Sequence, residues 1–234
     1  MKRTSNDWED VHQSRIWGTW PDEFLIRTVN KYLGKERGSR RYALDIGCGV
    51  GASFPLLVEH GYVVYGIDIS PTAAIRARQN LEKLESGRLN LDTERPPSVA
   101  NRILVADLSG SFPLFDVQFD LIVDIETLCY LPFEVAQERL TEAYNFATPG
   151  AALVARVFSN FQQVGGGARP TGLGSLVKAV SGPLAGMPAQ RLTSEEEIQE
   201  LVAPWHIADL ELAERHSRLN NERVSEWLIR GVKK

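Results

Sequence analysis

Apolar residues recur along the chain in two alternating patterns. Short apolar or β-branched runs, typical of buried strands, lie at 43–46, 62–67, 102–106, 119–124, 151–158, 205–213 and 223–232. Apolar residues at helical spacing, with helix-compatible sequence, lie at 22–33, 52–60, 71–84, 133–147 and 191–202. Strands that alternate with helices in this way predict an α/β fold with a doubly wound, mostly parallel sheet and helices on both of its faces.

Composition narrows the class of protein. The 234 residues, 43% of them hydrophobic and 24% charged, suit one soluble domain of ordinary size. A net charge of −4 gives no basic face, which counts against a nucleic acid partner. The absence of a long apolar run or signal segment predicts a cytoplasmic protein without membrane contact. Cys48 and Cys129 have no partners spaced for a metal site, so we expect reduced thiols and no metal.

The stretch from Tyr42 to Phe54 reads Y-A-L-D-I-G-C-G-V-G-A-S-F, a buried strand followed by a tight glycine turn and a helix. Such a turn lets the backbone approach a ligand and is expected to aim free amide groups at it. A dinucleotide site would read G-x-G-x-x-G, and a carboxylate beside its pyrophosphate would be unfavourable. Here Asp45 stands two residues before the first glycine, which favours a ligand with a positive end. The alternative is a glycine-rich turn of any α/β domain.

At these residues the chain resembles the class I, Rossmann-like S-adenosylmethionine-dependent methyltransferases of the small-molecule type, whose first motif is an acidic residue followed by this glycine pattern. The resemblance implies an enzyme with S-adenosyl-L-methionine as its cofactor. It also implies a seven-stranded sheet whose antiparallel last strand is inserted between the fifth and the sixth. The cofactor contacts that it implies are Asp45, Gly47, Cys48, Gly49, Gly51, Asp68, Ile69, Ala106, Asp107, Leu108, Asp124 and Ile125.

Three acidic residues at strand ends have roles implied by the resemblance. Asp68 would bind the ribose hydroxyls; the alternative, a cap for the helix near Pro71, suits Ser70 better. Asp107 would accept a hydrogen bond from the adenine amino group, the alternative being a surface aspartate that caps a turn. Asp124 would line the methionine end of the cofactor.

The resemblance also suggests how one methyltransferase domain is organised. Residues 1–40 are expected to form a helical extension or lid, 41–159 the cofactor-binding half, 160–190 a glycine-rich substrate loop, and 191–234 a helix and strands. In the extension, Trp17 and Trp20 either cover the acceptor or anchor the segment to the core. The glycine-rich loop has the alternative of a disordered connection.

Glu126 and Tyr130, just past the fourth strand, are predicted acceptor-side residues. The segment I-E-T-L-C-Y-L-P around them lacks the proline-proline-aromatic tetrapeptide typical of enzymes that methylate base amino groups. In-line displacement on an activated methyl needs positioning more than a base, since positioning supplies roughly 7 to 11 kcal/mol of the barrier. We therefore assign no catalytic residue; His12 and His216 are the only histidines worth testing.

The sequence thus predicts methyl transfer to a small-molecule acceptor. An RNA methyltransferase is the main alternative. A nicotinamide oxidoreductase would explain the glycine turn and Asp68 but not Asp45, and a non-catalytic protein of the same fold would have little reason to keep the acidic positions. The sequence predicts neither the acceptor atom nor the oligomeric state.

Overall fold

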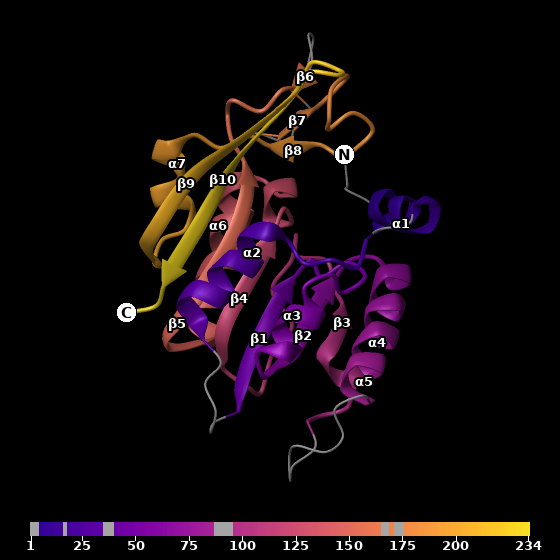
Figure 1. Cartoon of the computed structure of the whole chain (residues 1–234), viewed down its shortest axis with the longest axis vertical. Helices are drawn as coiled ribbons and strands as arrows, with labels where there is room; N and C mark the ends of the chain where they lie inside the picture. The colour runs from indigo at the N-terminus through magenta and orange to yellow at the C-terminus, as the bar shows by residue number, and fades with distance from the viewer. Residues whose placement is uncertain (1–4, 16–17, 35–39, 87–95, 165–168, 171–175) are drawn as a thin grey trace. The chain divides into compact units, whose positions relative to one another are not determined.

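A computed structural model describes residues 5–15, 18–34, 40–86, 96–164, 169–170 and 176–234. It contains a seven-stranded sheet with the strand order β3-β2-β1-β4-β5-β10-β9 and helices around it (Figure 1). The strands are β1 (Arg41–Ile46), β2 (Tyr62–Asp68), β3 (Ile103–Val105), β4 (Phe119–Ile125), β5 (Ala147–Phe158), β9 (His206–Ser217) and β10 (Glu222–Val232).

The connectivity of the sheet confirms the predicted fold class. Strand β1 pairs in parallel with β2, and β2 pairs in parallel with β3. The last strand, β10, is antiparallel to both of its neighbours, β5 and β9. It therefore stands between the fifth and sixth strands of the large sheet, where the family resemblance placed it.

The chain divides into two compact units, Lys2–Val123 and Asp124–Lys234. The predicted single domain with its four segments stays a prediction. Within the described ranges, none of the helices combines the length and apolar character that a membrane-spanning helix needs.

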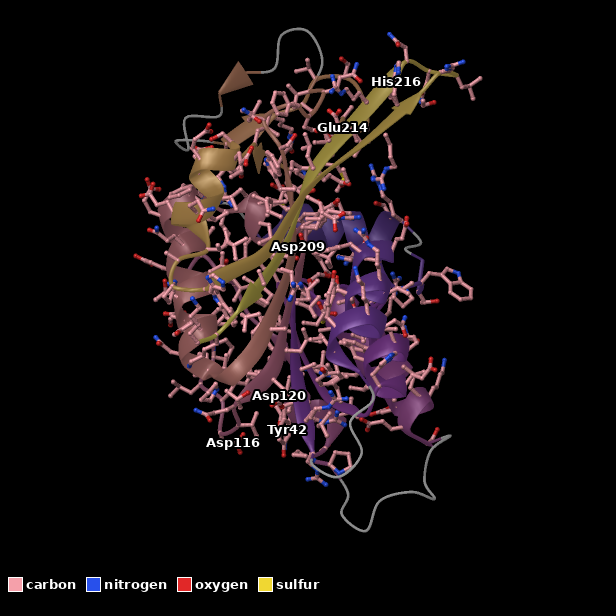
Figure 2. The ribbon with its side chains drawn as sticks, turned by 60° about the vertical axis from the view of Figure 1, so that its left-hand side comes forward. Tyr42, Asp116, Asp120, Asp209, Glu214 and His216 are labelled. Carbon is pink, nitrogen blue, oxygen red and sulfur yellow. The ribbon has the colours of Figure 1, made fainter. Side chains whose placement is uncertain are left out.

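The N-terminal unit contains β1, β2, β3 and most of β4. Its helices are α1 (Ser5–Ser14), α2 (Glu23–Thr28) with a following π-helical turn η1 (Val29–Leu33), α3 (Phe54–Glu59), α4 (Pro71–Ser86) and α5 (Val99–Arg102). Asp22 caps α2, because its carboxylate accepts hydrogen bonds from the amides of Phe24 and Leu25. At the amino-terminal ends of the strands, the Tyr42 amide donates to Asp120 Oδ2 at 2.8 Å (Figure 2).

The start of β3 differs from the prediction. Residues 99–102 form α5, so β3 begins at Ile103 instead of residue 102. The reason is the buried Arg102 guanidinium, which donates to the carbonyl oxygens of Pro97 and Val64 and pairs with Glu85. These contacts make Arg102 part of a tertiary network that apolar patterning along the chain does not reveal.

The C-terminal unit contains β5, β9 and β10, whose outer strand β9 carries Asp209, Glu214 and His216 (Figure 2). Its helices are η2 (Leu128–Tyr130), α6 (Phe133–Phe146) and α7 (Glu195–Leu201). A small antiparallel sheet of β6 (Arg169–Pro170), β7 (Leu176–Lys178) and β8 (Gln190–Arg191) occupies part of the predicted substrate loop.

The predicted helix at 191–202 begins later in the structure. Arg191 belongs to β8, and α7 starts after Ser194. Ser194 accepts a hydrogen bond from the Glu197 amide, while the Glu197 carboxylate accepts one from the Ser194 amide. This capping box fixes the start of the helix at the serine rather than at the earlier polar residues.

Candidate functional site

The glycine turn between β1 and α3 is built around left-handed backbone conformations. Gly49 has φ +54° and Gly51 has φ +85°, values that side chains disfavour. A Cβ on Gly51 would lie 2.5 Å from the Phe54 ring, whereas a Cβ on Gly49 would meet only His12 Cε1, at 3.7 Å. Gly51 therefore allows the turn to pack, while at Gly49 there is room for a Cβ beside His12.

Three backbone amides of this turn donate hydrogen bonds within the protein, whereas the prediction was that the turn offers free amide groups to a ligand. The Cys48 amide donates to the Ile67 carbonyl, the Gly49 amide to Asp68 Oδ2, and the Gly51 amide to the Cys48 carbonyl, at 2.8 to 2.9 Å. The expectation of free amide groups in this turn does not hold for these three, because the neighbouring strand and the turn itself use them. What the turn offers a ligand is close approach rather than these donors.

Asp45 and Cys48 lie at the carboxyl end of β1. Asp45 is 3% exposed and stands opposite Gly66 of β2 in the parallel register. The Cys48 sulfur fills the space at Gly66, where a Cβ would come within 2.8 Å of it. Burial, followed by the charges of Asp68 and Asp45, raises the pKa of the Cys48 thiol well above its ordinary value. Cys48 is thus a packing residue whose burial disfavours the thiolate form.

Asp68 connects the glycine turn to the start of α4. Its Oδ2 accepts from the Gly49 amide at 2.9 Å and its Oδ1 from the Ser70 amide at 2.8 Å. Burial raises the pKa of Asp68 despite these two donors. The Ser70 hydroxyl accepts from the Ala73 amide, so the residue that caps α4 is Ser70, not Asp68. Each Asp68 oxygen retains a lone pair for a further donor.

At the end of β3 the structure shows a turn. The Ala106 amide donates to the Asp68 carbonyl, which brings the two strand ends together. Asp107 is exposed and its Oδ1 accepts from the Ser109 amide at 2.8 Å, the arrangement of an aspartate that caps a turn. Leu108 is buried. This geometry matches the alternative for Asp107, and its adenine contact stays a prediction.

Helix α1 brings two side chains to the carboxyl end of β2. His12 is 6% exposed, beside Gly49 and under the electrostatic influence of Asp68. Glu9 accepts a hydrogen bond from the Ser70 hydroxyl. The sequence singled out His12 only as part of a possible lid, and it did not single out Glu9, because nothing local indicates a partner 61 residues away.

In the C-terminal unit, Asp124 lies near the end of β4 and holds the tight turn that follows the strand. The side chain is 1% exposed, and its Oδ1 accepts from the amides of Thr127 and Leu128 at 3.0 and 3.1 Å. Burial raises the pKa of Asp124 to about 6, the two amide donors only partly opposing it. Ile125, which follows, is partly exposed.

Glu126 has a left-handed backbone with φ +57°, which is uncommon for a residue with a side chain. Its amide donates to the Arg156 carbonyl, and its carboxylate pairs with the Arg156 guanidinium at 2.7 Å. Arg156 Nε also lies 3.8 Å from Glu226, which pairs with Arg215. A chain of alternating charges therefore leads from Glu126 to the outer strand.

Arg191 is a buried residue that sequence patterning missed. Its Nη1 donates to the carbonyl oxygens of Leu131 and Leu128, at 2.7 and 3.3 Å, and the guanidinium lies over the Phe133 ring. Burial lowers the pKa of Arg191 from its ordinary value. Among the described residues, Arg191 Nη2 and Asp124 Oδ2 are buried without a hydrogen-bond partner.

The remaining predicted acceptor-side residues fall into different environments. Tyr130 is buried and packs edge-on against Phe158. Trp20 is 87% exposed, so the alternative that it is buried as an anchor does not hold in this structure. Trp17 lies outside the described residues. The acceptor contacts of all these residues stay predictions.

Two further histidines, His60 and His216, have partners of their own away from the strand ends of the site. His60 is a core residue bonded to the Leu56 carbonyl and to Asn30, while exposed His216 contacts Asn221. In the part of the chain that the structure describes, no group of three or more metal-binding side chains comes together.

Comparison with known proteins adds to this geometry. Residues 44–155 match the methyltransferase domain family. A 2-heptyl-1-hydroxyquinolin-4(1H)-one methyltransferase of Mycobacteroides abscessus is 28% identical over 138 residues, covering 59% of this chain and 53% of that protein. The tRNA N(3)-cytidine methyltransferase METTL2 of Danio rerio is 30% identical over 146 residues, covering 60% of this chain and 37% of that protein. The chain thus spans about half the length or less of these two relatives.

Solved structures share the fold over nearly the whole chain. The magnesium protoporphyrin IX methyltransferase ChlM from Synechocystis PCC 6803, in its structure with bound SAM, has a TM-score of 0.56 and 17% identity. The match covers 98% of this chain and 97% of that one. At this identity the likeness establishes the fold.

Proposed function

We propose that the chain, whose residues 44–155 match the methyltransferase domain family, is an S-adenosylmethionine-dependent methyltransferase that acts on a small molecule. The observation that carries the proposal is the arrangement in the N-terminal unit. There, Asp68 accepts from the amide of Gly49, and buried Asp45 ends the strand that leads into the same turn. A dinucleotide with its pyrophosphate would account for Asp68 but not for the second buried carboxylate, Asp45, whereas a ligand with a positively charged end would account for both.

The residues present fit this cofactor. The turn leaves Gly49 without a side chain where a ligand would approach, and the two oxygens of Asp68 can each accept one more hydrogen bond. Asp45 would hold the ammonium group and Asp68 the ribose hydroxyls, while Asp107 would meet the adenine amino group. Gly47, Cys48, Gly51, Ile69, Ala106 and Leu108 are the other proposed contacts of this unit.

S-Adenosylmethionine, when bound, supplies a methyl group already activated by the sulfonium. The chain's own task is therefore to bind, orient and exclude water. In the C-terminal unit, we assign Asp124 and Ile125 to the methionine end of the cofactor and Glu126 and Tyr130 to the acceptor. The Glu126 backbone, held by Arg156, fixes the direction of its carboxylate. No residue is assigned as the general base.

The proposed acceptor is a small metabolite in the cytoplasm. The net charge of −4 supports this over RNA, and the quinolone methyltransferase relative supports it as well. The tRNA methyltransferase relative makes RNA the second candidate. The comparison with that relative extends over 37% of its length, so it leaves most of that protein without a counterpart in the match.

Two measurements test the proposal. Calorimetric titration should show binding of S-adenosylmethionine and S-adenosylhomocysteine, and no binding of NAD at the same concentrations. Incubation with methyl-labelled cofactor and fractionated cell extract should then place the label in the small-molecule fraction. Label in tRNA or rRNA would favour the second candidate, and binding of NAD alone would refute the methyltransferase.

A further inference from the structure

The two edge strands of the large sheet differ in length. At one edge, β3 has three residues, and a short edge strand offers little backbone for pairing with another chain. At the other edge, β9 has twelve residues, and in the part of the chain that the structure describes no strand pairs with its outer side (Figure 1). Its sequence, HIADLELAERHS, contains neither proline nor glycine, the residues that commonly interrupt an edge strand. The outer backbone groups of β9 can therefore pair with a further strand.

Opposite charges lie on one face of β9. Arg215 Nη2 lies 3.0 Å from Glu226 Oε2 of β10, and the Arg215 side chain is 64% exposed. Asp209 lies on the same face, because side chains alternate along a strand, and it stands opposite Arg230 of β10. Midway between Asp209 and Arg215, and on the other face, is Leu212, which is 40% exposed. Each end of this stretch thus carries a charge beside an opposite charge of β10.

This pattern is complementary to itself. Two copies of one strand can pair antiparallel about a two-fold axis only with one residue opposite itself, because opposite residues share a face. With Leu212 on the axis, Asp209 of each copy stands opposite Arg215 of the other, and the two leucines meet on the other face. An axis at Glu211 or Glu214 would instead set identical carboxylates against each other.

Two other axes fit the charges and the apolar residues less well. An axis at Leu210 would set Asp209 against Glu211, a pair of like charges. An axis at Ala213 would form an ion pair too, but it would set Leu212 against a glutamate. The axis at Leu212 therefore joins apolar to apolar and negative to positive.

We propose that the chain forms a symmetric dimer in which the outer sides of β9 from two copies pair antiparallel, with Leu212 on the two-fold axis. The partner is a second copy, because the charges of β9 complement those of the same strand turned around. From Glu226 through Arg215 to Asp209 and Arg230 of the second copy, charges of opposite sign then alternate. The proposal stands apart from the proposed function, since none of these residues is assigned to the cofactor or the acceptor.

Sedimentation velocity of the full chain tests the association. Wild type should change from monomer to dimer between about 1 and 200 μM, because pairing along one strand gives a small interface and weak association. Leu212→Glu should raise the dimer dissociation constant about tenfold, since it places two carboxylates on the axis. Leu219→Glu is the matched control, because Leu219 is 98% exposed in the turn after β9 and the same change there should leave the constant as in wild type.

A cysteine on the axis tests the register. Leu212→Cys should form a disulfide between two copies under mild oxidation, because opposite residues of antiparallel strands lie within the range that a disulfide spans. Ala208→Cys is the matched control, since it is also exposed on β9 but its two copies would lie about 27 Å apart along the paired strands. The native Cys48 and Cys129 are buried and should not compete.

The outcomes separate pairing from register. A wild-type chain that stays monomeric to about 200 μM, or a dimer that Leu212→Glu leaves as strong as in wild type, would refute pairing through β9. A disulfide that forms through Ala213→Cys instead of Leu212→Cys would overturn the register. Circular dichroism of each variant distinguishes dissociation from unfolding. Because cofactor binding tests the proposed function separately, failure of the dimer would leave that proposal standing.

Discussion

Asp124 and Arg191 hold the two backbone polar groups of the same residue, Leu128. Asp124 Oδ1 accepts from the Leu128 amide at 3.1 Å, and Arg191 Nη1 donates to the Leu128 carbonyl at 3.3 Å. Both side chains are buried, and each affects the ionisation of the other. The turn that carries Tyr130 is therefore fixed by two opposite charges instead of by a longer helix.

The Arg191 contacts predict a large loss of stability for Arg191→Lys. A single ammonium group cannot replace a guanidinium that serves two carbonyl oxygens and stacks on Phe133, so buried acceptors lose their donors. We expect the free energy of unfolding in urea to fall by about 2 to 4 kcal/mol. Arg218→Lys, an exposed change in the β9–β10 hairpin, should stay within about 0.5 kcal/mol of wild type. Equal effects of the two changes would contradict the role of Arg191.

The raised pKa of Asp124 predicts how stability depends on pH. Its folded value of about 6 lies above the roughly 3.9 of an unfolded aspartate, so between these values the folded chain keeps a proton that the unfolded chain releases. The contribution of the Asp124 carboxyl group to the free energy of unfolding is fully present below about pH 4 and is lost as pH rises through 6. This loss of stability amounts to about 3 kcal/mol.

Asp124→Asn removes this titration and keeps an oxygen that can accept from the Thr127 and Leu128 amides. Urea unfolding at intervals from pH 4 to 7.5 should therefore show that the free energy of unfolding of the variant increases relative to that of wild type as pH rises. A constant difference between the two proteins across this range would contradict the buried, proton-binding carboxyl.

Sequence patterning predicted the elements whose signals are local. The glycine turn, the buried strands and α4 follow from apolar runs and from residues with special backbone preferences, so their places agree with the structure. Element boundaries differ from the prediction where tertiary contacts decide them. Buried Arg102 belongs to the helical turn α5, so the strand predicted from residue 102 starts after it. Strand β5, predicted from residue 151, already starts at Ala147, and its pairing with β10 begins at Ala152.

The candidate site was predictable only where it follows strand ends. Asp45, Asp68 and Asp124 stand directly at carboxyl ends of strands, and the rule that ligands bind there singles them out. Glu9 and Arg191 could not be found in this way, because their partners lie about 60 residues away in sequence. The use of the Gly49 amide by Asp68 likewise depends on two strands meeting.

Gly49 and Gly51 should respond differently to alanine. At Gly51 the new methyl group would overlap the Phe54 ring in a strained backbone, so we expect a loss of about 2 to 5 kcal/mol in urea unfolding. At Gly49 only the backbone strain remains, about 1 to 2 kcal/mol. Gly49→Ala should nevertheless weaken S-adenosylhomocysteine binding in calorimetry, because the proposed site places the ligand against this turn. Wild-type affinity in Gly49→Ala would show that the turn is not the cofactor surface.

Asp45 provides the most direct test of the proposed contact with the ammonium group of the ligand. Asp45→Asn keeps the size of the side chain and removes the charge, so it should weaken binding of S-adenosylhomocysteine, which carries an ammonium group, about tenfold to a hundredfold. Binding of methylthioadenosine, which has the nucleoside but no ammonium group, should change little. Asp120→Asn is the matched control, because Asp120 lies at the amino-terminal end of β4 with Tyr42 (Figure 2) and an asparagine oxygen can still accept from the Tyr42 amide. If Asp45→Asn weakened both ligands equally, Asp45 would act through the shape of the turn and its assignment to the ammonium group would be wrong.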